Sequence, residues 1–191
     1  MQLYILYFLI LLGGLRLGAQ SQRDDVIYLA DPTVFEDEGM YYLYGTKGDN
    51  TIKGSGFLVY TSKDLKHWEG PVGSSDGFAL KKGDAYGNKG FWAPQIFKHK
   101  AKYYMAYTAN ENIAIATSDS PLGPFVNDNK ALEAPVRQID PYVFFDEDKV
   151  YLYHVRLQEG NRIFVATIDH TDLLNHPAIL VVFTILLDSL G

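Results

Sequence analysis

The sequence lacks cysteine altogether and is poor in positive charge. Without cysteine, the chain has no disulfide framework, no thiolate zinc site and no cysteine nucleophile. Its 17 Lys and Arg residues are outnumbered by 23 Asp and Glu residues, which gives a formal net charge of −6. A chain with this balance offers no positive field to a phosphate backbone, so we expect no nucleic acid among its partners.

The sequence also lacks a metal-binding pattern. It has five histidines, none of them in a spacing such as HExxH: His67, His99, His154, His170 and His176. Ordinary surface or strand positions account for such scattered histidines better than metal ligation does. We therefore expect neither a metal nor another cofactor.

A short apolar run from Leu3 to Leu12 opens the chain and is followed by small residues that end in Gly18-Ala19. This pattern is typical of a secretory signal peptide over residues 1–19, so we expect a secreted or periplasmic protein. An uncleaved anchor is the alternative, because Arg16 follows the run and no basic residue precedes it. The run is well short of the ~20 apolar residues that span a bilayer, so we expect no stable membrane insertion.

Aromatic residues, in contrast, are abundant. The 191 residues include 14 Tyr and 11 Phe, and 47% of the chain is hydrophobic. Aromatic and β-branched side chains pack well on a pleated surface, which favours strands over helices. The length suits one domain with a core of its own. The composition therefore predicts an all-β domain.

Three segments of the sequence follow one plan. They are ADPTVFEDEGMYYLYGT from Ala30, WAPQIFKHKAKYYMAYT from Trp92 and IDPYVFFDEDKVYLYHV from Ile139. Each has a proline at its third position, an apolar pair two and three places later, a charged turn and a second strand rich in tyrosine. The shared plan predicts three β-hairpins in equivalent settings.

The stretches after the hairpins repeat as well. Each contains an alternating apolar strand that ends in Ser, Thr or Asp, and two of them continue to an aromatic residue, Trp68 or Phe125. This adds a third strand to each hairpin and, with the aromatic residue, a fourth. Four antiparallel strands that recur about every 50 residues are typical of β-propeller blades. A stack of unrelated hairpins is the alternative, and the threefold register argues against it.

Asp31, Ala93 and Asp140 occupy equivalent positions in the three segments. In a propeller, the innermost strands begin beside the central axis, so two carboxylates are expected to converge at one mouth of the channel. Two acids in a partly dry pocket repel each other, which raises at least one pKa and suits them to proton transfer. The alternative is structural, because Asp-Pro is a frequent turn pair and Asp can cap its own backbone.

Several motifs together resemble glycoside hydrolase family 43, the five-bladed propeller enzymes that act on arabinan, xylan and related plant polysaccharides. The motifs are LADPTVF, FWAPQIF, YYMAYTA, IAIATSDSPLGPF and IDPYVFFDEDKVYLYHVR. The resemblance runs from about Tyr28 to about Leu174. It implies an all-β propeller of four-stranded antiparallel blades with about three of five blades present, and a partial catalytic domain over residues 20–175.

The resemblance also implies a mechanism, namely hydrolysis of O-glycosidic bonds with inversion at the anomeric centre, as in α-L-arabinofuranosidases and β-xylosidases. In the family's scheme the general base falls on Asp31, and the residue that tunes the pKa of the acid falls on Asp140. Trp92 is a candidate platform for a sugar ring, with core packing as the alternative. Arg156 is a candidate ligand for a sugar hydroxyl or carboxylate, with plain surface exposure as the alternative.

The sequence departs from the family at its end. The family's general acid is a Glu in the fourth blade, and no Glu here lies in a matching motif; Glu159, in a hairpin turn, is not assigned this role. Residues 176–191 form an atypical apolar tail, which suggests a truncated or partial product. Three blades cannot close a ring, so we expect self-association through the uncovered faces. A non-catalytic carbohydrate-binding or vestigial propeller fragment is the alternative function.

Overall fold

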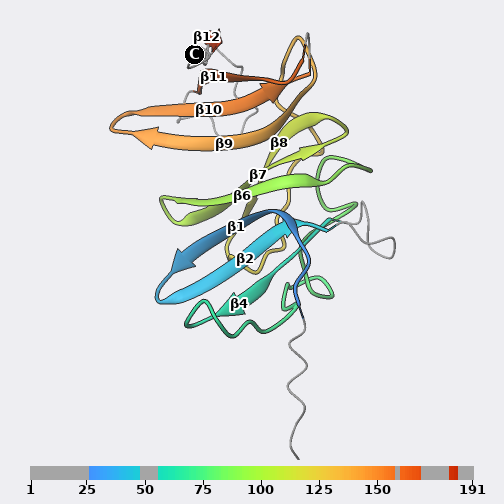
Figure 1. The fold of residues 1–191 in the computed structure, drawn as a ribbon, viewed down its shortest axis with the longest axis vertical. Helices are drawn as coiled ribbons and strands as arrows, with labels where there is room; N and C mark the ends of the chain where they lie inside the picture. The colour runs from blue at the N-terminus through green and yellow to red at the C-terminus, as the bar shows by residue number, and fades with distance from the viewer. Residues whose placement is uncertain (1–25, 48–55, 158–159, 169–180, 185–191) are drawn as a thin grey trace, which may run out of the picture.

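The computed structural model describes residues 26–47, 56–157, 160–168 and 181–184. Within these ranges the chain forms strands and turns and no helix (Figure 1). The prediction of an all-β fold is therefore confirmed. No helix long and apolar enough to cross a membrane occurs in this part of the chain. The predicted signal peptide, residues 1–19, and most of the apolar tail, residues 176–191, lie outside the described residues.

The strands pair in antiparallel sheets, and we call the three largest sheets blades 1, 2 and 3. Blade 1 consists of β1 (Ala30–Asp37), β2 (Met40–Thr46) and β4 (Tyr60–Ser62). Blade 2 consists of β6 (Trp92–His99), β7 (Lys102–Ala109) and β8 (Asn112–Ser118). Blade 3 consists of β9 (Gln138–Asp146), β10 (Lys149–Arg156), β11 (Arg162–Ile168) and β12 (Val181–Thr184). The short strands β3 (Gly56–Leu58) and β5 (Phe78–Lys81) pair with each other.

The three blades follow one another along the long axis of the molecule (Figure 1). The first strands of neighbouring blades contact each other, β1 with β6 and β6 with β9. We call these three the inner strands. Each of the three predicted hairpins is present, with two residues between its strands. At the first of these turns Glu38 and Gly39 both have positive φ, as a type I′ hairpin turn requires.

The fourth strand predicted for blades 1 and 2 is reduced to a single bridge in each. Thr61 pairs with Glu69 in blade 1, and Thr117 pairs with Val126 in blade 2. Pro71 and Pro124 stand two residues from these bridges, and a proline has no N–H with which to extend a ladder. Blades 1 and 2 therefore have three regular strands each, where the sequence pattern predicted four.

Blade 3 does have a fourth strand, at a place where we predicted none. Val181–Thr184 of the apolar tail pairs with β11, from Phe164 opposite Thr184 to Thr167 opposite Val181. The continuous apolar run at this point carries neither the alternation nor the flanking turn residues that mark the other strands. Part of the tail is thus the outer strand of blade 3.

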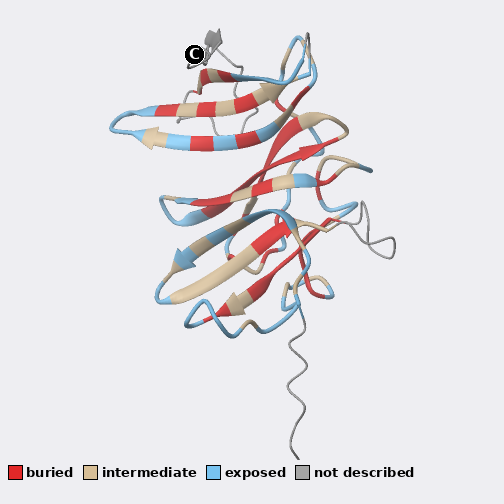
Figure 2. Cartoon of the chain, viewed as in Figure 1, coloured by how far each residue is buried: buried red, intermediate tan, exposed pale blue. Residues whose placement is uncertain are grey.

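Burial explains why the strands of the three blades differ in their pattern of apolar and polar residues (Figure 2). Blade 2 packs on blade 1 with one face and on blade 3 with the other, so β7 is buried from Tyr103 to Ala109 and is apolar almost throughout. Among the described residues, strand β9 packs with one face, and from Pro141 to Phe144 it alternates between buried and exposed residues. Ring pairs such as Phe57 with Tyr107 and Phe97 with Tyr104 fill the two cores between the blades.

A polar contact also joins blades 1 and 2, at the end of β1. Asp37 Oδ1 accepts a hydrogen bond from Lys98 Nζ at 2.7 Å, and Asp37 Oδ2 accepts one from the Tyr103 hydroxyl at 2.6 Å. The Asp37 side chain is 16% exposed. These two donors, Lys98 first and Tyr103 second, hold the pKa of Asp37 below its usual value.

We predict that Asp37→Asn lowers the free energy of unfolding by about 1–2 kcal/mol at pH 7, because Asn loses the charge-assisted bonds. The folded-state pKa of Asp37 is lowered, so its contribution is present above the unfolded-state value of about 3.9 and is lost as the pH falls. Urea unfolding at pH 7 and pH 2.5 measures the difference. Asp119→Asn, which breaks the exposed pair with Lys102, is the control and should cost less. A loss of stability that is the same at both pH values would contradict the prediction.

Candidate active site

The three equivalent positions at the starts of β1, β6 and β9 share one backbone conformation. Asp31, Ala93 and Asp140 have φ values of 47°, 45° and 55°, in the left-handed region that few L-residues adopt. The pairing register shifts at the corresponding place in each blade, as at a β-bulge. The Asp-Pro and Ala-Pro pairs therefore mark the bulges at which the inner strands begin.

Threonine hydroxyls hold these bulges against the neighbouring blade. The backbone N–H of Ala93 donates to Thr46 Oγ1 at 2.9 Å, and the backbone N–H of Asp140 donates to Thr108 Oγ1 at 2.9 Å. Thr46 Oγ1 in turn donates to Asp31 Oδ2 at 3.0 Å. The end of the second strand of one blade thus fixes the start of the first strand of the next.

The structure brings the two predicted carboxylates within electrostatic reach of each other. Burial raises the pKa of Asp140, and the negative charge of Asp31 raises it further. Both residues remain accessible to solvent. The site thus combines Asp31, which is exposed to solvent, with Asp140, whose carboxyl is harder to ionise than usual.

Trp92, the residue before Ala93, lies at the same end of blade 2. Its side chain is 36% exposed, so it is not a core residue. The indole rests on Gly90, where an added Cβ would lie 3.1 Å from the ring. The exposed aromatic surface is therefore available to a ligand at this end of the blade.

Arg156 ends β10 and is held by aromatic neighbours. Its guanidinium lies 4.5 Å from the centroid of the Phe164 ring, and its Nε donates to His154 Nε2 at 3.4 Å. Burial and, to a lesser degree, the charge of Arg156 lower the pKa of His154 to about 4. Arg156 is half-buried and not a free surface residue.

Four polar residues near these positions were not predicted from the sequence: Thr46, Thr108, His154 and Gln138. Gln138 is fully buried opposite Arg156, and its side-chain amide has no hydrogen-bond partner among the described residues. The two threonines had a signal, since they are the last residue of the first two repeats. His154 and Gln138 had none, because they take core positions that a strand pattern assigns to apolar residues.

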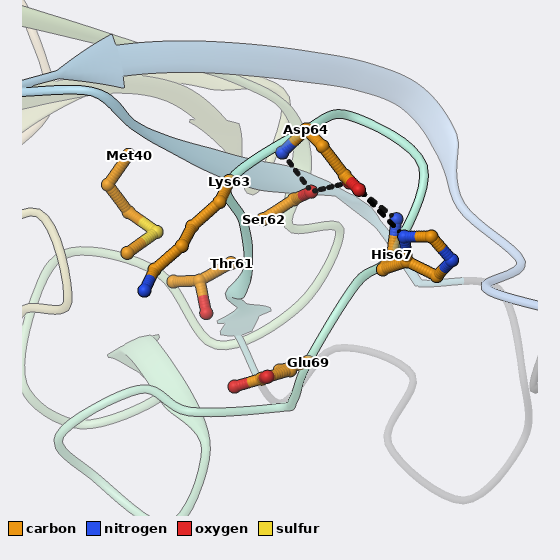
Figure 3. Close-up of a pocket in the computed structure, with 7 residues that line it drawn as sticks. All are labelled: Met40, Thr61, Ser62, Lys63, Asp64, His67 and Glu69. Atoms are coloured by element: carbon orange, nitrogen blue, oxygen red, sulfur yellow. Dashed lines mark hydrogen bonds and ion pairs between the residues drawn. The ribbon is translucent and has the colours of Figure 1, made fainter.

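A separate cavity of about 230 Å³ lies beside the far end of blade 1, next to the β1–β2 turn (Figure 3). Seven residues line it: Met40, Thr61, Ser62, Lys63, Asp64, His67 and Glu69. Asp31 is at the opposite end of β1, and neither it nor Asp140 lines this cavity. The cavity is therefore distinct from the candidate active site.

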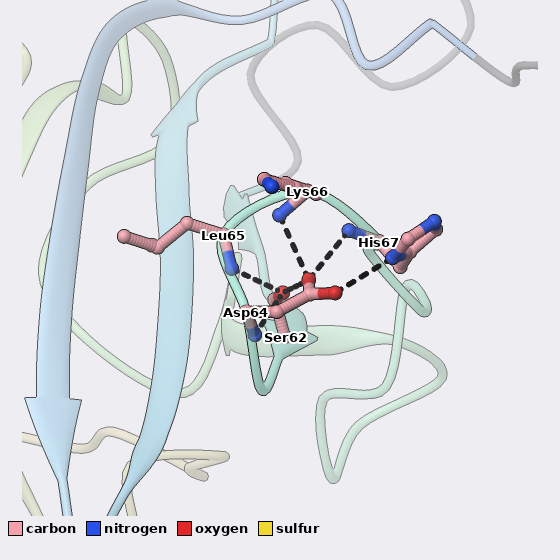
Figure 4. A network of polar contacts seen from close by, with 5 residues as sticks. All are labelled: Ser62, Asp64, Leu65, Lys66 and His67. Carbon is pink, nitrogen blue, oxygen red and sulfur yellow. Dashed lines mark hydrogen bonds and ion pairs between the residues drawn. The ribbon is translucent and has the colours of Figure 1, made fainter.

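Asp64, one of the two acids that line this cavity, forms hydrogen bonds within its own turn (Figure 4). Asp64 Oδ1 accepts the backbone N–H groups of Lys66 and His67, and Asp64 Oδ2 bonds to His67 Nδ1 at 2.7 Å. These bonds hold the pKa of Asp64 far below its usual value, and that of His67 above its own. Among the described residues no group of three or more His, Asp or Glu could hold a metal ion.

Comparison with known proteins gives a match over most of the chain. Residues 27–183 match glycosyl hydrolases family 43. The chain is 31% identical over 163 residues to xylosidase/arabinosidase 43A of Humicola insolens, which covers 73% of this chain and 50% of that protein. It is 28% identical over 141 residues to an extracellular endo-α-(1→5)-L-arabinanase of Thermotoga petrophila, which covers 64% of this chain and 28% of that protein.

The fold agrees with this match. The crystal structure of an endo-1,4-β-xylanase from Bacteroides thetaiotaomicron VPI-5482 superposes with a TM-score of 0.67 at 40% identity, over 76% of this chain and 48% of the xylanase chain. The chain thus spans about half the length of the Humicola protein and of the xylanase. Its sheets are propeller blades, and the relatives named here are glycosidases. The chain belongs to glycosyl hydrolases family 43.

Proposed function

We propose that this chain carries the inverting site of a glycoside hydrolase that cleaves arabinan- or xylan-type plant polysaccharides, as an α-L-arabinofuranosidase or a β-xylosidase. The observation that carries the proposal is the pair Asp31 and Asp140, which come from equivalent bulges and lie close enough for the charge of Asp31 to raise the pKa of Asp140. The names of the relatives, which include xylosidase, arabinosidase, arabinanase and xylanase, support the substrate class.

Asp31 is the general base in this proposal. It is exposed, and Thr46 bonds to Oδ2, so that among the described residues Oδ1 is the oxygen left to accept a proton from an attacking water. An inverting site needs such a base on the far side of the sugar ring from the acid. Removal of a general base typically costs 10²- to 10⁴-fold in rate.

Asp140 has a different role, as the residue that tunes the general acid. In its ionised form it would raise the pKa of a nearby acid and keep that acid protonated, as the charge of Asp31 raises the pKa of Asp140. We assign the general acid itself to no residue of this sequence, since no Glu lies in a motif that matches the family's acid.

Trp92 and Arg156 bind the sugar in this proposal. The exposed indole face of Trp92 offers apolar contact to the hydrophobic face of a pyranose or furanose ring. Arg156 is held by Phe164 and His154 through its Nε side, which leaves its terminal nitrogens for a hydroxyl or carboxylate. We also propose that the protein is exported, on the basis of residues 1–19 and the extracellular name of the Thermotoga relative.

We predict that the chain releases nitrophenol from aryl α-L-arabinofuranosides or aryl β-xylosides and that Asp31→Asn lowers kcat by about 10²- to 10⁴-fold. Proton NMR in the first minutes of the reaction should show the product with the opposite anomeric configuration to the substrate. Asp146→Asn, the same change at the far end of β9, is the control and should retain the activity. Saccharide binding without turnover would favour the non-catalytic fragment, and retention of configuration would refute the assigned roles.

We predict that Asp31→Asn also lowers the pKa of Asp140, because it removes the negative charge that disfavours ionisation of that carboxyl. The pKa should remain above the ordinary value of 3.8, since burial is the larger cause of the rise. Carbon-detected NMR titration of the Asp140 carboxyl measures the change. An Asp140 pKa that is the same in both proteins would show that the two carboxylates do not interact.

We also propose self-association through the outer face of blade 3. Strands β9 and β11 expose Tyr142 (55%), Phe144 (45%) and Ile163 (41%) on the face that does not pack on blade 2. Several large apolar side chains on one sheet face are typical of an interaction surface.

We predict that the average mass of the chain rises with concentration in sedimentation experiments and that the double variant Tyr142→Lys/Phe144→Lys stays monomeric at the same concentrations. The two lysines place like charges on the contact face. Val126→Lys, at an exposed valine of blade 2, should leave the association unchanged. A wild-type mass that does not vary with concentration would refute self-association.

A further inference from the structure

We propose that Thr46 is the positioning residue for Asp31, and this inference rests on the proposed role of Asp31 as the general base. The Thr46 hydroxyl has one proton to donate and lone pairs with which to accept. Its proton goes to Asp31 Oδ2 at 3.0 Å, and it accepts the Ala93 N–H at 2.9 Å. The backbone of blade 2 thereby fixes the hydroxyl, and the hydroxyl fixes the carboxylate.

The accepted bond determines where the donated proton points. A free hydroxyl rotates about its C–O bond and can bond to water instead of a carboxylate. The Ala93 N–H occupies one lone pair of Thr46, which leaves the proton on the side of Asp31. One oxygen of Asp31 is then engaged, and Oδ1 remains as the acceptor for water.

Blade 2 contains the matching threonine without the second bond. Thr108 stands opposite Trp92, as Thr46 stands opposite Ala30, and it accepts the Asp140 N–H at 2.9 Å. The residue after Trp92 is Ala93, which offers no carboxylate to a hydroxyl. Thr108 therefore joins blades 2 and 3 only, whereas Thr46 joins two blades and holds an acid.

Blade 3 shows that the position tolerates an aliphatic residue. Val155 stands opposite Ile139, in the register that the two threonines occupy. Thr46→Val is close in shape to the wild-type residue and lacks only the hydrogen-bonding hydroxyl. Asp31→Ala is equally mild, because Ala93 already occupies the same backbone conformation.

A double-mutant cycle on the full chain tests the contact without requiring turnover. Urea unfolding is measured for wild type, Thr46→Val, Asp31→Ala and the double variant. We expect Thr46→Val to raise the unfolding equilibrium constant in both backgrounds. The factor by which it rises should be at least about three times larger in wild type than in Asp31→Ala. Thr108→Val should raise it by the same factor in both backgrounds, because Thr108 does not touch Asp31. Equal effects of Thr46→Val in the two backgrounds would overturn the proposal.

Kinetics on an aryl glycoside test the consequence. We expect Thr46→Val to lower kcat by about 10- to 100-fold with KM nearly unchanged, and Thr46→Ser to restore most of kcat. A kcat that Thr46→Val does not lower in an active chain overturns the positioning role. A chain without turnover refutes the proposed hydrolase, and in that case coupling in the unfolding cycle still supports the placement of Asp31 by Thr46.

Discussion

The left-handed bulge at the start of each inner strand is the constraint on which the rest of the structure depends. It occurs at Asp31, Ala93 and Asp140 with nearly the same φ. In blades 2 and 3 the bulge presents the backbone N–H to a threonine hydroxyl of the preceding blade. One backbone geometry therefore joins neighbouring blades and also places a side chain at the same end of every inner strand. Because the bulge is structural, the side chain that it carries is free to serve function.

The aspartates of the described chain differ in the direction in which their surroundings shift the pKa. Asp37 and Asp64 are surrounded by donors, which lower their pKa values and make them structural. Asp140 has the opposite shift, since burial and the negative charge of Asp31 both disfavour its ionised form. A fold gains no stability from a carboxyl that is harder to ionise in the folded state than in the unfolded chain. The direction of the shift thus separates the acid at the start of β9 from those that hold turns and blades together.

Sequence patterns were sufficient to predict the three hairpins and the equivalence of positions 31, 93 and 140, because each repeat contains the same proline and apolar pair. They were not sufficient for the outer strands, where Pro71 and Pro124 limit the pairing and β12 lacks alternation. Contacts such as that between Asp37 and Tyr103, 66 residues apart, leave no local pattern. Within the site, the threonine that ends the first two repeats can be seen in the sequence. The backbone N–H that its hydroxyl accepts belongs to the next blade, so the sequence does not predict this bond.

Ala93, the repeat position without an acid, has a physical reason to be uncharged. Blade 2 lies between blades 1 and 3, so a carboxylate at position 93 would stand between Asp31 and Asp140. A third negative charge there would raise the pKa of Asp140 further and would repel the ionised carboxylate of Asp31. It would also provide an acceptor for the Thr108 hydroxyl, as Asp31 does for Thr46. Alanine keeps the bulge and its N–H bond to Thr46 and places no further charge beside the two acids.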